Sequence, residues 1–167
     1  MITTLMLFFA LFSIQGFFNP RMPEEMVSAD VDAAAQRLAE QFISILQQDH
    51  ADHLALCATS EMFTALIART PELYDGNVTE AKADFVTRYE NDVLPAIRDM
   101  VQSIREEGRR KGIDWKSVKI SKVELNEEDG YHLTIQLDSN GSVFRIVLAK
   151  VLLFNGEFKI TQYGELI

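Results

Sequence analysis

The sequence predicts one α+β domain in which N-terminal helices pack on a curled antiparallel sheet of about four strands. Up to about residue 112, apolar residues recur every three or four positions, as they do on one face of a helix. After Ile113 they recur every second position, as they do on a strand. Helices first and strands last is an order typical of α+β folds rather than of alternating α/β folds.

The N-terminal 20 residues differ in composition from the rest of the chain, because they contain no charged side chain. Their apolar run, Leu5–Phe12, has the length of a signal-peptide core. It is shorter than the roughly 20 residues that cross a membrane. We therefore expect a signal peptide at 1–20, a linker at 21–29 and a single domain at 30–167. The domain is then exported, periplasmic or secreted, with no stable membrane span; the alternative is an uncleaved N-terminal anchor.

The first predicted helix follows the linker. Ser28 or Asp30 is suited to cap it, because a short polar side chain accepts hydrogen bonds from the first backbone N–H groups. A short helix is expected near Leu54–Cys57, and a third helix capped by Thr59 or Ser60. The apolar stripe of the first helix comprises Val31, Ala34, Ala35, Leu38, Phe42, Ile45 and Leu46.

A long helical stretch is predicted over residues 79–107, where apolar residues recur at every fourth position. Pro95 interrupts it, because proline lacks the N–H that an inner helical position donates. We expect a kink near Asn91–Leu94 or two helices in sequence. Basic residues at Arg109–Lys111 complement the negative end of the helix dipole.

The C-terminal part predicts an antiparallel meander. The alternation changes phase between Ile120 and Val123, which predicts a bulge near Ser121–Lys122. Asn155-Gly156 is a strong signal for a two-residue hairpin turn. The later strands are expected at Tyr131–Leu137, Val143–Phe154 and Glu157–Tyr163.

The strand Val143–Phe154 is apolar on both faces and is therefore predicted to be central in the sheet. One of its faces is expected to point outward and to need a cover, which suggests a homodimer through the sheet. The residues of that face are Phe144, Ile146, Leu148, Leu152 and Phe154.

Two stretches of the sequence resemble the NTF2-like superfamily, the cystatin-like α+β roll that includes SnoaL-like and ketosteroid isomerase-like domains. One is AEQFISILQQDHADHLALCATSEMFTAL, a first helix that leads into a polar break and a short helix. The other is the closing hairpin VLLFNGEFKITQYGEL, similar to the family's "nGkWkI" hairpin, with Phe158 at the usual aromatic position. The resemblance implies a cone between helices and sheet, and the sequence fits an uncharacterised exported bacterial member.

Enzymes of this superfamily hold polar groups inside the cone. We consider a pocket lined by Tyr89, Tyr131 and Arg145 that binds a small amphipathic or acidic ligand. The alternative for both tyrosines is a core aromatic ring with its hydroxyl at the rim. The alternative for Arg145 is a cross-strand ion pair or a position at a strand end.

Asp49, His50 and His53 form the one candidate metal site, because two imidazoles three residues apart lie on one helical turn. The alternative is a solvated turn between helices. No dinucleotide or phosphate-binding fingerprint occurs, so no cofactor is expected.

Composition narrows the function. The formal net charge of −9 argues against nucleic-acid binding, which needs a basic surface, and one cysteine excludes an intramolecular disulfide. We therefore interpret the chain as an exported non-enzymatic binding or protein-interaction module whose small ligand or protein partner is unknown. The alternative is a small isomerase or SnoaL-like enzyme that uses the cone pocket.

Overall fold

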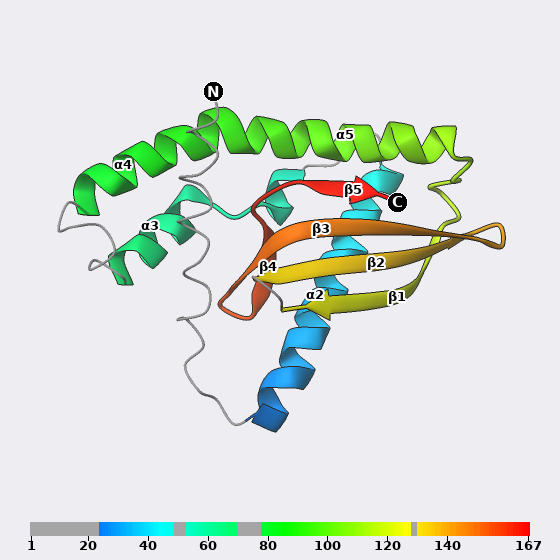
Figure 1. Ribbon diagram of the computed structural model, residues 1–167, viewed down its shortest axis with the longest axis horizontal. Helices are drawn as coiled ribbons and strands as arrows, with labels where there is room; N and C mark the ends of the chain where they lie inside the picture. The colour runs from blue at the N-terminus through cyan, green and yellow to red at the C-terminus, as the bar shows by residue number, and fades with distance from the viewer. Residues whose placement is uncertain (1–23, 49–52, 70–77, 128–129) are drawn as a thin grey trace.

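The computed structural model describes residues 24–48, 53–69, 78–127 and 130–167. Its helices precede its strands, and the strands form one curled antiparallel sheet, so the predicted α+β class is confirmed (Figure 1). The strands are β1 (Lys119–Asn126), β2 (Tyr131–Ser139), β3 (Ser142–Phe154), β4 (Glu157–Ile160) and β5 (Gly164–Leu166).

The sheet order is β1-β2-β3-β4, and β5 pairs with β3 on the same edge as β4. Figure 1 shows α2 behind the sheet, crossing its strands, and the α4–α5 rod along the side where β5 lies. The helical elements are α2 (Glu24–Gln47), the 3₁₀ helix η2 (His53–Leu56), α3 (Ser60–Arg69), α4 (Val78–Arg88), the π-helix η4 (Tyr89–Val93) and α5 (Leu94–Arg110).

The first predicted helix is present as α2, but it begins at Glu24, inside the stretch that the sequence predicts to be a linker. The predicted apolar stripe, from Val31 to Leu46, is at most 9% exposed and belongs to the core. Thr59 caps α3 as predicted, because its hydroxyl accepts a hydrogen bond from the Met62 N–H at 3.2 Å.

The predicted break in the long helical stretch is present as a single π-helical segment. α4 gives way to Tyr89–Val93, and the Leu94 N–H donates to the Tyr89 carbonyl, five residues back. Pro95 then stands in the first turn of α5, where its missing N–H costs least. The widened turn therefore lies directly before the residue that cannot continue an α-helical ladder.

The predicted bulge and the predicted Asn155-Gly156 turn are confirmed, and a second turn of the same kind lies at Asn140-Gly141. The β1–β2 register shifts between Ile120 and Lys122, which leaves Ser121 as the extra residue. Asn140 and Asn155 have φ angles of 54° and 50°, and the glycines that follow them have 81° and 80°. Positive φ at both central residues is the geometry of a type I′ turn, which matches the twist of the strands that it joins.

Lys150 divides β3 into two halves whose inward faces are out of phase. Before it, Ile146 and Leu148 are fully buried; after it, Val151 is fully buried opposite Ile160. Lys150 has a φ of 55° and forms a β-bulge, which inserts one extra residue into β3. The alternation of inward and outward side chains is therefore reversed after it. The first half of the strand therefore has one core face, whereas in the second half Val151 faces the core and its neighbour Leu152, on the other side, is also buried.

This phase change overturns the predicted apolar outer face. Ile146 and Leu148 face the helices, and Phe144 packs against the same core. Leu152 pairs with Lys159, beyond the bulge and therefore on the other side. The five residues expected to share one exposed face do not share a face, so they give no basis for a homodimer.

The last predicted strand is also corrected, because it is two strands. β4 ends at Ile160 and β5 begins at Gly164. The interruption lies opposite the Lys150 bulge, where the Thr161 hydroxyl donates to the Lys150 carbonyl. A Cβ at position 164 would lie 2.8 Å from the Val147 carbonyl oxygen, so glycine allows the chain to return close against β3.

Arg105 of α5 joins the two long helices. Arg105 is only 7% exposed. Its guanidinium donates through Nη2 to the carbonyls of Ile45 (2.7 Å) and Gln48 (2.8 Å) and through Nε to that of Leu46 (3.3 Å). Ile45 and Leu46 belong to the last turn of α2, which has no basic residue of its own, and Gln48 directly follows that turn. The Ile45 carbonyl also accepts from the Gln48 N–H at 3.2 Å. The buried positive charge also lies at the negative end of the α2 dipole.

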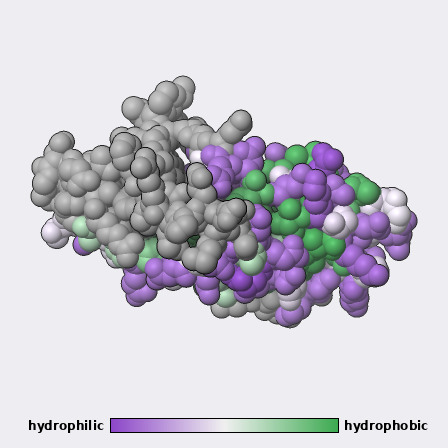
Figure 2. All heavy atoms as spheres, turned by 90° about the horizontal axis from the view of Figure 1, so that it is seen from below, coloured by the Kyte–Doolittle hydropathy of each residue, from purple (hydrophilic) through white to green (hydrophobic). Residues whose placement is uncertain are grey.

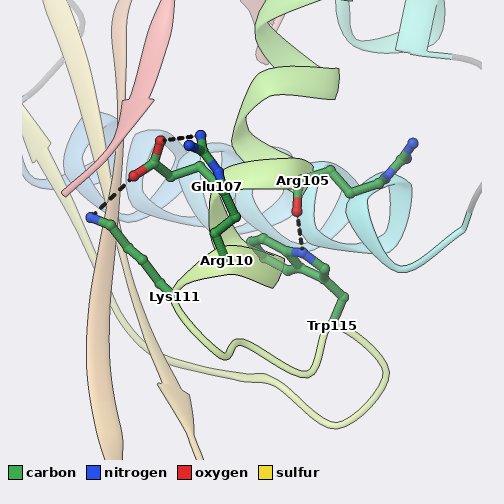
Figure 3. A network of polar contacts seen from close by, with 5 residues as sticks. All are labelled: Arg105, Glu107, Arg110, Lys111 and Trp115. Carbon is green, nitrogen blue, oxygen red and sulfur yellow. Dashed lines mark hydrogen bonds and ion pairs between the residues drawn. The ribbon is translucent and has the colours of Figure 1, made fainter.

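Trp115 fixes the loop that follows α5 to the backbone of Arg105 (Figure 3). Its indole Nε1 donates to the Arg105 carbonyl at 3.0 Å, and its ring packs on Gly108. A Cβ at position 108 would lie 2.1 Å from Trp115 Cζ2. Glycine inside α5 is therefore required by the close approach of the indole.

Within the described residues, no helix combines the length and apolar character that crossing a membrane demands. The predicted signal peptide, residues 1–20, lies outside these residues.

We predict that Arg105→Met lowers the free energy of unfolding by about 2–4 kcal/mol, because it removes three hydrogen bonds to carbonyls at the end of α2, two of them buried. Arg105→Lys should lose part of this, since one ammonium cannot reach all three. Chemical denaturation measures the difference. Arg98→Met, at an exposed position of the same helix, is the control and should change stability little. Equal effects of the two methionine variants would contradict the role of Arg105.

We predict that Gly108→Ala destabilises the fold by about 1–3 kcal/mol, because the methyl group displaces the Trp115 indole. Helix propensity alone predicts the opposite sign, since alanine is favoured over glycine by about 1 kcal/mol inside a helix. Thermal unfolding of Gly108→Ala and of Ser103→Ala, an exposed position on α5, separates the two effects. A Gly108→Ala protein more stable than wild type would exclude the close packing.

Candidate functional site

Tyr89 lies between helices, at the start of the π-helix. Its ring packs on Phe63 with a centroid distance of 4.8 Å, and its hydroxyl donates to the Ala58 carbonyl at 2.5 Å. Burial, and next the charge of the nearby Cys57 thiol, raises the pKa of Tyr89 above its ordinary value. The phenol is therefore neutral, buried and hydrogen-bonded to backbone.

Tyr131 lies on the core side of the sheet. It pairs with Val151 in the register and packs edge-on against Phe158, with ring centroids 5.1 Å apart. Burial, and next the charge of Glu127, raises the pKa of its phenol. Tyr89 and Tyr131 thus belong to two different aromatic pairs.

Arg145 lies on the opposite face of the sheet from the core. It pairs with Gln136, and its two neighbours in β3, Phe144 and Ile146, pack toward the helices. Its side chain is exposed. The structure therefore does not bring Arg145 together with the core-facing Tyr131.

Of the predicted metal site, Asp49 and His50 lie outside the described residues. His53 begins η2, and its carbonyl accepts a hydrogen bond from Cys57 Sγ at 3.5 Å. Among the described residues, no group of three or more histidine, cysteine, aspartate or glutamate side chains is placed to hold a metal ion.

The outer face of the sheet, on the side away from α2, carries two rows of side chains that run across the strands. We define the cationic row as Lys122, Gln136, Arg145 and Ile167, and the anionic row as Glu124, Thr134, Val147 and Glu165. Strand register places the members of each row on neighbouring strands, from β1 through β2 and β3 to the last strand. The Arg145–Ile167 pairing extends this last strand, because each N–H donates to the other carbonyl. The rows lie about 7 Å apart, two residues along each strand.

The charges of the two rows interact. Lys122 Nζ lies 2.6 Å from Glu124 Oε1 on the same strand. The hydrogen bond and charge of Lys122, and more weakly the charge of Arg145, hold the pKa of Glu124 below its ordinary value. Arg145 thus lowers the pKa of Glu124 only weakly, from two strands away.

Large apolar side chains in and beside these rows are exposed. Val143 is 58% exposed, Ile167 61% and Tyr163 67%. Val143 pairs with Asp138 at one end of the face, and the Tyr163 carbonyl accepts from the Ala149 N–H toward the other. An open sheet face with apolar and balanced charged groups is suited to bind a protein surface.

Sequence reasoning missed this face because it assigned Phe144, Ile146 and Leu148 of β3 to the outer side of the sheet, and therefore Arg145 to the core side. The missed residues are Lys122, Glu124, Val143, Glu165 and Ile167. The available signal was Arg145 itself, since a charged residue in the first half of a central strand marks the solvent side. The apolar residues after Lys150 concealed it.

The fully buried interior has few groups for acid–base chemistry. Among the described residues, the polar or charged side chains under 9% exposed are Arg105, Ser139, Lys150 and Thr161, together with the Tyr89 phenol, the Cys57 thiol and the Trp115 indole. None of these is a carboxylic acid. Arg105 and Thr161 donate to backbone carbonyls, and the Ser139 hydroxyl accepts from the Asp114 N–H at 3.3 Å.

We predict that Lys122→Met raises the pKa of Glu124 toward its ordinary value and that Arg145→Met raises it less. A carboxyl group whose pKa is lowered by folding stabilises the fold above its unfolded pKa, and this contribution is lost as pH falls through the lowered value. Lys122→Met should therefore weaken the acid dependence of stability below about pH 4.5. NMR titration of the Glu124 carboxyl carbon measures the shift. A larger effect of Arg145→Met would contradict the assigned order.

Comparisons with protein-family models, curated proteins and solved structures found no match.

Proposed function

We propose that this chain is an exported, non-enzymatic interaction module that binds a protein partner through the outer face of its sheet. The observation that carries the proposal is the exposure of Val143 and Tyr163 beside the two charged rows and of Ile167 within one of them. Apolar side chains grouped on an open face gain free energy when a partner covers them, at about 25 cal/mol per Å² of apolar area.

The inner face of the sheet is already covered by the helices α2 and α5. Leu133, Ile135 and Leu137 of β2 are fully buried there, as are Ile146 and Leu148 of β3. The stripes of α2 and α5 belong to the same core. This favours binding on the outside of the sheet over binding in a cone between the sheet and the helices.

Catalysis of the isomerase type requires a carboxylate base and a hydrogen-bond donor that converge on the substrate. The described interior offers Tyr89, whose hydroxyl donates to the Ala58 carbonyl, and Tyr131, which packs on Phe158. No aspartate or glutamate of the described residues is among the fully buried side chains. Binding is therefore favoured over catalysis.

We also propose membership of the NTF2-like superfamily, on two grounds. Helices precede a curled antiparallel sheet, and the closing β3–β4 hairpin carries Phe158 in the core opposite Leu153. Export is supported by the uncharged N-terminal 20 residues.

A site-specific photocrosslinker tests the binding face. With p-benzoyl-phenylalanine replacing Val143 in the full chain, irradiation of the exported fraction of producing cells should give one discrete adduct. The same replacement at Asp99, exposed on α5, should not give that adduct. Adding Ile167→Asp should remove it, because a carboxylate is introduced into the covered surface.

Mass spectrometry identifies the adduct. An adduct that forms equally from position 99, or the absence of any adduct from position 143, would count against the outer face as the binding surface.

A further inference from the structure

Basic side chains are concentrated at one end of the molecule, where α5 ends and β1 begins (Figure 1). Residues 109–119 contain 5 basic side chains and 1 acidic one, a net charge of +4. The rest of the chain contains 11 basic and 24 acidic side chains, a net charge of −13. We define the cationic end as five exposed residues, Arg109, Arg110, Lys111, Lys116 and Lys119.

The acidic side chains near the cationic end do not neutralise it. They are those of Glu106, Glu107, Asp114 and Asp138. Glu107 is shared between two cations, because its Oε2 lies 3.0 Å from Arg110 Nη2 and its Oε1 lies 3.8 Å from Lys111 Nζ (Figure 3). Within the part of the chain that the structure describes, no carboxylate is within ion-pair distance of Lys116 or Lys119. These two ammonium groups are therefore available to a partner.

The turn that carries Lys116 is held in place by hydrogen bonds. The Asp114 carboxylate accepts from the Lys116 N–H at 3.1 Å and from the Ser117 hydroxyl at 2.7 Å. The Asp114 N–H donates to the Ser139 hydroxyl at 3.3 Å, and the Trp115 indole is bonded to α5. A surface whose backbone is already ordered loses less conformational entropy when a ligand binds.

The cationic end continues into the outer face of the sheet. Lys119 pairs with Asp138 in the register of β1 and β2, and Asp138 pairs with the exposed Val143 of β3. Seen from below, the described residues toward this end are mainly hydrophilic (Figure 2). A partner that covers Val143 therefore lies about 10 Å from Lys119, two strand spacings away.

We propose that the protein partner of this chain carries a short segment rich in aspartate and glutamate, and that this segment binds the cationic end. The proposal rests on the proposed function and states the chemistry of its partner. The cationic end attracts the segment, and the acidic remainder of the chain repels it from other positions.

A short segment suits this distribution of charge better than an extended anionic surface does. A bilayer of anionic lipids or a nucleic acid is wider than the cationic end and also brings its charges near the first helices. Residues 21–80 contain 3 basic and 11 acidic side chains, so like charges oppose that approach. A peptide of a few residues contacts the cationic end alone.

Fluorescence anisotropy of the full chain with a labelled oligoglutamate peptide tests the proposal, with an oligoglutamine peptide as the blank. The wild-type chain should bind oligoglutamate, and more weakly as the salt concentration rises. Lys116→Gln/Lys119→Gln should bind it roughly fivefold more weakly, because two exposed ion pairs are lost. Thermal unfolding shows whether this variant is folded.

The matched control is Lys82→Gln/Arg98→Gln, which removes the same charge from α4 and α5. It should change the affinity by less than about twofold. Equal losses in the two double variants would overturn the proposal, since net charge alone would then explain the binding. A wild-type chain that does not bind oligoglutamate would overturn it too. Vesicles of anionic phospholipid that bind the wild-type chain more tightly than the peptide does would assign the cationic end to a membrane instead.

The crosslinker at position 143 separates this proposal from the proposed function. Adding Lys116→Gln/Lys119→Gln should lower the yield of the adduct, and oligoglutamate should compete with its formation. An adduct whose yield is unchanged by both would leave the outer face as the binding surface and remove only the acidic segment.

Discussion

The hydrogen bonds that Arg105 donates to the carbonyls at the end of α2 are the interaction on which the rest of the fold depends. α2 and α5 contribute the two apolar stripes that cover the sheet. The Arg105 guanidinium joins these helices at the C-terminal end of α2, where no further helical turn supplies N–H groups to the carbonyls. The Arg105 carbonyl, in turn, accepts from Trp115, which directs the chain toward β1. One residue thus fixes the helical layer through its side chain and the start of the sheet through its backbone.

The sheet depends on a second local constraint, the bulge at Lys150. The bulge exchanges the two faces of β3 along its length and divides the final strand into β4 and β5. Its first half leaves Arg145 and Val147 outside, and its second half turns Val151 inward. The position of the charged rows on the solvent side is therefore set by where the bulge falls in the sequence.

Local features were predictable from the sequence, and long-range ones were not. The Thr59 cap, the break before Pro95 and the bulge at Ser121 each depend on the chemistry of a few neighbouring residues. Arg145 marked the solvent side of the first half of β3, but the reversal after it was not predictable, because a positive φ at a lysine has no local signal comparable to Asn-Gly. The role of Arg105 was hidden for a similar reason, since its partners lie 57 to 60 residues away. The candidate site was therefore recognised only through Arg145, and placed on the wrong side of the sheet.

The type I′ turns have a consequence for how quickly the parts of this fold assemble. The β2–β3 and β3–β4 pairings close through two-residue turns and have low contact order, whereas α2 reaches the sheet only through contacts such as Arg37 to Gly156, 119 residues apart. Closing such a long loop costs entropy before any contact compensates for it. We therefore expect the meander to form early and the docking of α2 to limit the folding rate, with the core face of the sheet exposed to solvent in the interval.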